Sequence, residues 1–280
     1  QSKYVTTQAQ LEELARELEG SKLLAIDTEF MREKTYYAKL CLLQLNNGKV
    51  SALVDPLAVH DLSPLAPILT DENCVKIFHA GTQDIAILYH ETGVTPSPVF
   101  DTQVAASLLG YPLQVGYGPL VRSVCDVKLA KADSYTDWSR RPLTNSQIKY
   151  ALDDVIYLPS VYEHLRDELI EKGRLTWCER DFAALAALES YDVNPRECWH
   201  RVKRVSSLSR GQLSIARELA AWRETEAQQR NLPRKWVLAD EAVVEISRKA
   251  PKTREALFEV RGLANKLNGR DVKHILEAVA

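Results

Sequence analysis

Two acidic residues, Asp27 and Glu29, end a mostly apolar segment that begins at Lys22. The length and composition of this segment predict a central strand. Side chains two residues apart on a strand leave the same face, so both carboxylates are expected side by side. Two carboxylates held that close repel each other unless a divalent cation lies between them, and hard oxygen ligands select Mg²⁺ or Mn²⁺. Because many strands end in polar residues, the pair alone indicates a metal site only weakly.

A tyrosine and a third acid are spaced to share one face of a helix. Thr144 and Gln147 form a capping-box pattern that predicts a helix start, and Tyr150 and Asp154 follow four residues apart on that helix. Asp84 lies near the start of another predicted helix, where a carboxylate also favours the positive end of the helix dipole. Each of these residues taken alone could have a purely structural role. A functional site is indicated only by all of them occurring together in one sequence.

The combination resembles a known group of nucleases. Three segments resemble, in order, the three motifs of the DEDD exonuclease superfamily in its tyrosine-containing branch: Ile-Asp-Thr-Glu-Phe at 26–30, His-Ala-Gly-Thr-Gln-Asp-Ile at 79–85 and Tyr-Ala-Leu-Asp-Asp-Val at 150–155. Two more are similar to the ribonuclease D family in particular: Phe-Asp-Thr-Gln-Val-Ala-Ala at 100–106 and Thr-Asp-Trp-Ser-Arg-Arg-Pro-Leu at 136–143. The likeness covers about residues 5–172. The superfamily often has Asn in its second motif, and His-Ala-Gly at 79–81 favours the ribonuclease D subgroup.

This resemblance implies a metal-dependent 3′→5′ exoribonuclease that removes nucleoside 5′-monophosphates from RNA 3′ ends with two divalent ions, Mg²⁺ or Mn²⁺. It implies that Asp27, Glu29, Asp84 and Asp154 hold the metal ions. Tyr150 would orient the attacking water, because a phenol with a pKa of about 10 is a poor base at neutral pH. The implied substrates are single-stranded 3′ ends, above all those of tRNA precursors.

Residues beside these motifs are candidate substrate contacts. Phe30 could stack on the terminal base or belong to the core. His79 and Gln83 are candidates in the second motif, although a buried, hydrogen-bonded histidine is the ordinary alternative for His79. The likeness alone suggests that Trp138 and Arg141 line the groove.

The elements that position these residues alternate between strands and helices. The predicted strands span 22–30, 38–45, 49–54, 74–78 and 98–100, and an Asn-Asn-Gly turn joins the second to the third. Predicted helices span 82–91, 102–109 and the segment after Thr144, which Pro159 must divide. Asp101 precedes one of these helices, and we interpret it as an N-cap rather than a fifth catalytic acid. The pattern predicts an α/β fold with a mixed sheet. The resemblance to the exonuclease superfamily implies that this fold is ribonuclease H-like.

From about residue 208 the sequence predicts helices only, at 210–230, 240–249, 253–260 and 268–279. Arg-Glu-Leu-Ala-Ala-Trp-Arg at 217–223 and Val-Arg-Gly-Leu at 260–263 resemble the HRDC domain, a small all-α module. We therefore expect an exonuclease domain at 1–172, a helical connector at 173–207 and an HRDC domain at 208–280. The family commonly continues into a second such module and this chain opens at Gln1, so we expect part of a longer protein.

Length, composition and cysteine content limit the class of protein to which this chain can belong. The chain has 280 residues, of which 45% are hydrophobic and 26% charged, as in ordinary soluble proteins. No apolar run is long enough to span a bilayer and no secretion signal is visible, so we expect a cytoplasmic protein without a membrane partner. Five scattered cysteines with no Cys-x-x-Cys pair predict reduced thiols rather than disulfides or zinc.

Charge is unevenly distributed along the chain. Residues 1–200 carry 19 Lys and Arg against 28 Asp and Glu, a net charge of −9, while residues 201–280 carry 17 against 10, a net charge of +7. A basic module suits a polyanion such as RNA. Two rival readings remain at this level: a DNA-directed 3′→5′ exonuclease, since the same acids serve either substrate, and a catalytically inactive nucleic-acid-binding protein.

Overall fold

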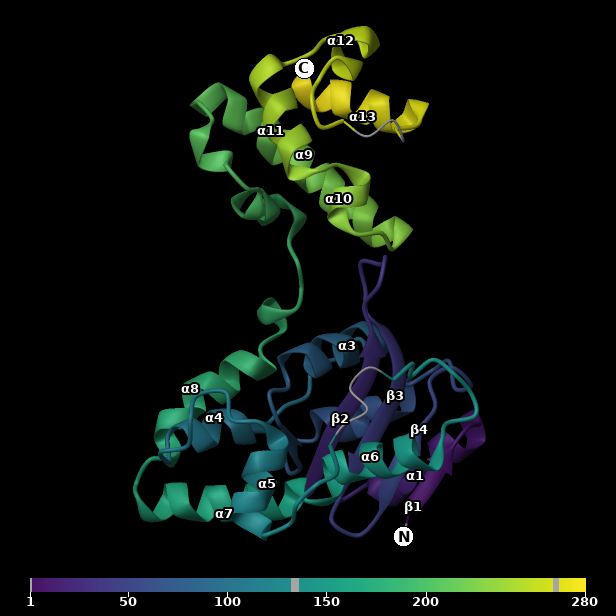
Figure 1. Cartoon of the computed structure of the whole chain (residues 1–280), viewed down its shortest axis with the longest axis vertical. Coiled ribbons are helices and arrows are strands. Elements are labelled where there is room, and N and C mark those ends of the chain that lie inside the picture. Colours follow the sequence, from purple (N-terminus) through teal and green to yellow (C-terminus); the bar gives the residue numbers. More distant parts are fainter. Residues whose placement is uncertain (1, 132–135, 264–266) are drawn as a thin grey trace. The chain divides into compact units, whose positions relative to one another are not determined.

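The computed structural model describes residues 2–131, 136–263 and 267–280 (Figure 1). It forms two compact units. The first contains the residues up to 31 together with 39–191, and the second contains 32–38 together with 192–280. Among the described residues, no helix is both long enough and apolar enough to cross a membrane.

The first unit is built on a six-stranded mixed sheet with the order β1-β4-β3-β2-β5-β6. Its strands are β1 (Ser2–Val5), β2 (Leu23–Met31), β3 (Lys39–Asn46), β4 (Ser51–Val54), β5 (Val75–Phe78) and β6 (Val99–Asp101). β2, β3 and β4 pair antiparallel, as the predicted hairpin requires, and β1, β5 and β6 each pair parallel to a neighbour. The predicted α/β class with a mixed sheet is confirmed. β1 was not predicted, because a four-residue edge strand that is mostly polar has almost no periodicity to detect.

Helices cover both faces of this sheet. They are α1 (Gln8–Leu18), α2 (Ala66–Thr70), α3 (Thr82–Thr92), α4 (Thr102–Ser107), α5 (Tyr117–Cys125), α6 (Asn145–Ile156), α7 (Leu158–Glu171) and α8 (Leu175–Ala186), with 3₁₀ turns at Ser63–Leu65 and Leu188–Ser190. Successive residues of a strand point to opposite faces, and every residue from Leu40 to Asn46 of β3 is buried. Neither face of the central strands is therefore open to solvent. On one face α6 contacts β2, β3 and β4 (Figure 1).

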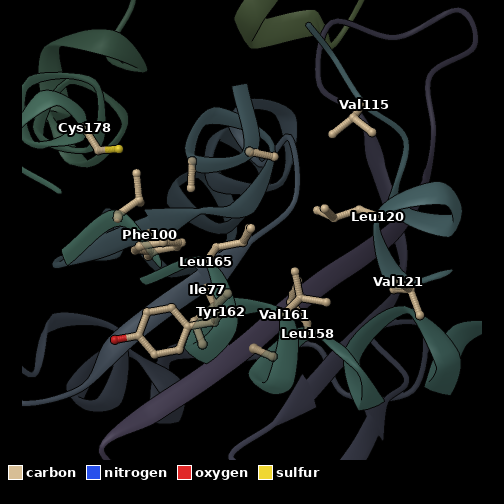
Figure 2. Close-up of a cluster of buried hydrophobic side chains, with 14 of the residues drawn as sticks. Ile77, Phe100, Val115, Leu120, Val121, Leu158, Val161, Tyr162, Leu165 and Cys178 are labelled. Carbon is tan, nitrogen blue, oxygen red and sulfur yellow. The ribbon is translucent and has the colours of Figure 1, made fainter. Parts of the chain in front are cut away.

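One apolar cluster of the first unit fastens the helices to the sheet (Figure 2). Ile77 of β5 and Phe100 of β6 pack against Leu165 of α7, and the Phe100 and Tyr162 rings meet edge to face at 4.8 Å. Each such side chain contributes about 1.5–3 kcal/mol when fully buried. Cys178 of α8 belongs to the same cluster, so α8, which lies in the expected connector, packs with the first unit.

A buried lysine ties together the loops around β5. Lys76 is fully buried, and its ammonium donates to the carbonyl oxygens of Asp71 (2.8 Å), Cys74 (2.6 Å) and Ser97 (2.7 Å). All three ammonium protons are thus used inside the protein.

The second unit is helical, as predicted. It contains α9 (Arg210–Arg230), α10 (Arg234–Val237), α11 (Asp240–Lys249), α12 (Arg254–Phe258) and α13 (Gly269–Val279), with 3₁₀ turns at Pro195–Arg201 and Val205–Ser207. Its core contains Leu219, Val243 and Ile275, and Val202 from the later part of the expected connector packs there too. α10 was not predicted, because four residues are too few for a helical period. All five cysteines are free, and four of them are buried.

Candidate active site

β2 holds Asp27 and Glu29 on the face that α6 covers. Ala25 and Met31, two residues before and after the acids, pack into apolar clusters on that face. A one-residue register slip would move both acids to the opposite face, where Ile26 and Thr28 are buried, so the packing on both faces of β2 fixes its register. The pairing of β2 with β3 shifts between Glu29 and Phe30, an irregularity of the kind that often lies next to active sites.

α6 supplies Tyr150 and Asp154, and its start is fixed as the sequence predicted. The Thr144 hydroxyl accepts from the backbone N–H of Gln147, and the Gln147 side chain accepts from the backbone N–H of Thr144. Ala151 is fully buried against the sheet, which turns the neighbouring face of the helix toward β2. The helix ends at Ile156, and Pro159 stands in the first turn of α7, as expected for a proline that divides two helices.

Three acids meet in one place. Asp27, Glu29 and Asp154 each offer a carboxylate oxygen, and these oxygens lie within 4.8 Å of one another. Burial and the neighbouring carboxylates raise the pKa of Glu29 to about 8 and that of Asp154 to about 8. Burial, then Asp84 and then Asp154 raise the pKa of Asp27 well above its usual range. Full ionisation of the cluster is therefore unfavourable, and a cation bound between the carboxylates would favour it.

Asp84 lies beside this cluster rather than within it. It stands in the first turn of α3, and its buried carboxylate accepts a hydrogen bond from the Thr28 hydroxyl. Burial raises the pKa of Asp84 to about 7. Gly81 makes the position possible, because a Cβ there would lie 2.4 Å from the Cβ of Phe78. Thr28 is thus a residue that the sequence motif contained but whose contact was not foreseen.

Two phenols face the acids. Burial and the nearby carboxylates raise the pKa of both Tyr150 and Tyr117 above the usual value, so both hydroxyls keep their protons at neutral pH. The Tyr117 hydroxyl donates to the backbone carbonyl of Asp153 at 2.7 Å. Tyr117 was not predicted as a site residue, because only the tertiary fold brings the start of α5 to the acids.

The three candidate substrate contacts, His79, Gln83 and Phe30, lie in different surroundings. His79 uses both ring nitrogens: Nε2 lies 2.8 Å from the carbonyl oxygen of Val115 and Nδ1 lies 2.8 Å from the Thr102 hydroxyl. Burial lowers the pKa of His79, which favours the neutral ring. Gln83 is exposed on the first turn of α3, and Phe30 is half-buried on β2. The assignment of these three side chains as substrate contacts stays a prediction.

Asp101 is an N-cap, as predicted. Its carboxylate accepts from the backbone amides of Gln103 (2.9 Å) and Val104 (3.4 Å) at the start of α4. It also accepts from the amides of Ala80 (3.1 Å) and Gly81 (2.8 Å), which lead into α3. Asp101 therefore shapes the loop that presents Asp84.

Trp138 and Arg141 were expected to line the groove, and the structure corrects this expectation. Arg141 pairs with Asp55 through Nε and Nη2, both at 2.9 Å, and its other three protons go to the carbonyl oxygens of Cys41, Trp138 and Arg140. All five guanidinium donors are used inside the first unit, so none remains for a phosphate. Trp138 is buried against Tyr150 with ring centroids 5.9 Å apart. Both residues brace α6 against β3 and β4.

The acids open into two adjoining cavities. A catalytic pocket of about 260 Å³ is lined by Asp27, Glu29, His79 and others. A larger groove of about 660 Å³ is lined by the segment 117–131 and the outer face of α6. Tyr117, Tyr150 and Asp154 line both cavities. The acids can therefore be reached by a ligand that also lies along the groove.

Comparison with known proteins gives two family matches. Residues 2–170 match the family of 3′-5′ exonuclease domains, and residues 212–279 match the HRDC domain. Over 270 residues the chain is 42% identical to a ribonuclease D of Sphingobium indicum, a match that covers 96% of this chain and 69% of the relative.

Comparison with solved structures points to the same family. The crystal structure of Escherichia coli RNase D, described as an exoribonuclease involved in structured RNA processing, matches with a TM-score of 0.89 and 32% identity, over 100% of this chain and 74% of that one. A structure of Brucella melitensis NrnC with bound Mg²⁺ matches with a TM-score of 0.55 and 27% identity, over 66% of this chain and 88% of that one.

Proposed function

Because the chain belongs to the ribonuclease D family and is a 3′→5′ exoribonuclease, we propose that it works through Asp27, Glu29, Asp84, Asp154 and Tyr150. The observation that carries this proposal is the meeting of Asp27, Glu29 and Asp154, whose oxygens lie within 4.8 Å although β2 and α6 are far apart in the sequence. Such crowding of partly buried acids costs stability, so it indicates a function that needs them together.

The donor set fits divalent metal ions. Carboxylate oxygens are the ligands that Mg²⁺ and Mn²⁺ prefer. The raised pKa values of Glu29 and Asp154 show that ionising both carboxyls together is unfavourable without a cation. The Mg²⁺ bound to the similar NrnC supports this choice. Asp27, Glu29 and Asp154 would hold one ion, and Asp27 with Asp84 a second. Two ions bound there would make a water more acidic and stabilise the charge on the leaving oxygen.

The chain's own groups orient the reaction. Water attacks the phosphorus of the last phosphodiester and its P–O3′ bond breaks. The proton lost by the water is balanced by one taken up at the leaving O3′, and a nucleoside 5′-monophosphate is released. Tyr150 keeps its proton, so its hydroxyl acts as a hydrogen-bond donor that positions the attacking water rather than as a base. The Tyr117 hydroxyl donates a hydrogen bond to the Asp153 carbonyl, and its side chain lines the catalytic pocket beside Asp154.

We further propose that the substrates are single-stranded RNA 3′ ends, including tRNA precursors, and that the protein acts in the cytoplasm. The relatives' name and the net charge of +7 over residues 201–280 support an RNA substrate. DNA stays a less favoured alternative that only the 2′-OH would distinguish.

A labelled-RNA assay tests the proposal. A 5′-labelled single-stranded RNA should give a ladder of 3′-shortened products with Mg²⁺ or Mn²⁺ and none with EDTA. A matched DNA oligonucleotide should be cut more slowly. A ladder that forms equally well in EDTA would contradict the proposed metal site, and faster cutting of DNA would contradict the substrate.

A further inference from the structure

The groove of about 660 Å³ beside the acids is lined by more cations than carboxylates, the carboxylates being Asp153 and Asp154. Four cations line it, namely Arg122, Lys128, Lys131 and Lys149. Residues 1–200 as a whole carry a net charge of −9, so a cluster of cations at the mouth of the acidic pocket is not what the composition alone would place there. It would counter the repulsion that the acids exert on an approaching polyanion.

These cations differ in whether a carboxylate of the protein already pairs with them. Lys149 forms an ion pair with Asp153 at 2.9 Å. Arg122 and Lys128 are exposed, and neither pairs with a carboxylate within the ranges 2–131, 136–263 and 267–280. Unpaired cations on a concave surface are available for phosphate groups without breaking an existing interaction.

The groove also has an apolar lining. Pro119, Leu129 and the ring of Tyr150 contribute to it. Single-stranded nucleic acid binds where cations follow its backbone and flat or apolar side chains contact its bases, and the groove offers both. Tyr117, Tyr150 and Asp154 line this groove and the catalytic pocket alike, so a strand whose 3′ end reaches the acids would continue into it.

We propose that this groove binds the nucleotides on the 5′ side of the scissile phosphate, with Arg122 and Lys128 contacting the phosphates that precede it. The proposal rests on the proposed exonuclease function and adds to it the path of the strand. A dinucleotide with a 5′ hydroxyl has only the scissile phosphate, so it has nothing to offer these two cations. Their contribution must therefore grow with substrate length.

The test compares two double variants of the full chain on two RNAs. In the groove variant Arg122→Gln is combined with Lys128→Gln. In the control variant Arg16→Gln is combined with Lys49→Gln, an equal loss of charge at exposed positions on α1 and beside the β3–β4 turn. The substrates are a 12-nucleotide RNA and a dinucleotide. Affinity is also measured in EDTA at several salt concentrations, which needs no catalysis.

For the groove variant we expect KM for the 12-nucleotide RNA to rise roughly tenfold with kcat unchanged. The slope of log affinity against log salt should fall by roughly 1.4, about 0.7 for each lost phosphate contact on a single strand. Dinucleotide cleavage should stay at the wild-type rate, and the control variant should match wild type on both RNAs. The swap of Arg122→Lys with Lys128→Arg should restore most of the affinity.

Other results would overturn the proposal. An unchanged salt slope and KM would show that the groove does not hold the strand, and an equal loss in the control variant would show a general charge effect. An equal loss on the dinucleotide would place the two residues at the reacting phosphate. Failure of wild type to cut either RNA would instead contradict the proposed function, and the binding data would still decide on the groove. If the groove variant has a lower melting temperature than wild type, the two single variants replace it in the test. Each single variant should then show half the change in salt slope.

Discussion

Asp154→Asn should stabilise the metal-free protein while it abolishes turnover. Burial and Glu29 raise the pKa of Asp154 from the 3.8 of an unperturbed aspartate to about 8, so the folded state binds a proton that the unfolded state releases at neutral pH. A carboxyl with a raised pKa costs stability as pH rises from about 4 to about 8. At pH 7 this cost reaches about 4 kcal/mol, at about 1.36 kcal/mol for each pH unit above 3.8.

Asparagine keeps the shape of the side chain and removes that cost, but its amide is still buried. We therefore expect a net gain of about 1–3 kcal/mol at pH 8 without metal. For a unit of this size the gain should raise the melting temperature by roughly 3–10 °C. At pH 4 the gain should vanish, because the wild-type carboxyl then folds protonated without a penalty.

The assay is thermal unfolding followed by circular dichroism in EDTA, at pH 4 and pH 8, with Asp153→Asn as the matched control. Asp153 is the preceding residue on α6 and forms an ion pair with Lys149 near the helix surface, so its variant should gain no stability and should keep most of the activity. Added Mn²⁺ should reverse the order of wild type and Asp154→Asn, since only wild type binds the ion well. A lower melting temperature for Asp154→Asn in EDTA at pH 8, or equal gains in both variants, would show that the Asp154 carboxylate does not destabilise the metal-free fold.

Three further predictions concern other parts of the molecule. Tyr150→Phe should lower kcat about 10²-fold with little change in RNA affinity, the usual scale for a lost positioning group, and an unchanged kcat would make its hydroxyl structural. Lys76→Met leaves three buried carbonyl oxygens without a donor, so urea unfolding should show a loss of about 3 kcal/mol or more, and a loss below 1 kcal/mol would contradict this role. Removal of residues 192–280 should weaken binding of long RNA and flatten its salt dependence while dinucleotide cleavage survives; an unchanged salt slope would make the helical unit a packing or protein-binding element.

Local patterns were enough to predict the elements that carry the acids. The apolar run before Asp27, the Asn-Asn-Gly turn and the capping box at Thr144 each have a physical cause within a few residues, and all three are found in the structure. The bounds of α9 and α11 also agree with the prediction, because Ser209 caps the first and the amphipathic period is regular in the second.

Features that depend on distant residues could not be predicted. Nothing near Arg141 in the sequence shows that Asp55, 86 residues away, takes its guanidinium, and the groove assignment for Arg141 was wrong for that reason. Tyr117 and the Thr28–Asp84 hydrogen bond likewise exist only once the sheet and its helices have assembled. Short elements such as β1 and α10 have too few residues for a period to be visible.

The most direct test of the central claim is single-turnover cleavage of a 5′-labelled RNA by wild type and by Asp27→Asn, each titrated with Mn²⁺ from an EDTA-treated stock. The carboxylate of Asp27 interacts electrostatically with both Asp84 and Asp154. Replacement of this carboxylate should therefore disturb the whole acidic site. We expect wild type to shorten the RNA from its 3′ end with a rate that rises with Mn²⁺ and saturates. Asp27→Asn should stay folded, bind the RNA and release no nucleotide at any Mn²⁺ concentration. Cleavage by folded Asp27→Asn at a rate close to wild type, or wild-type cleavage that is independent of Mn²⁺, would contradict the account.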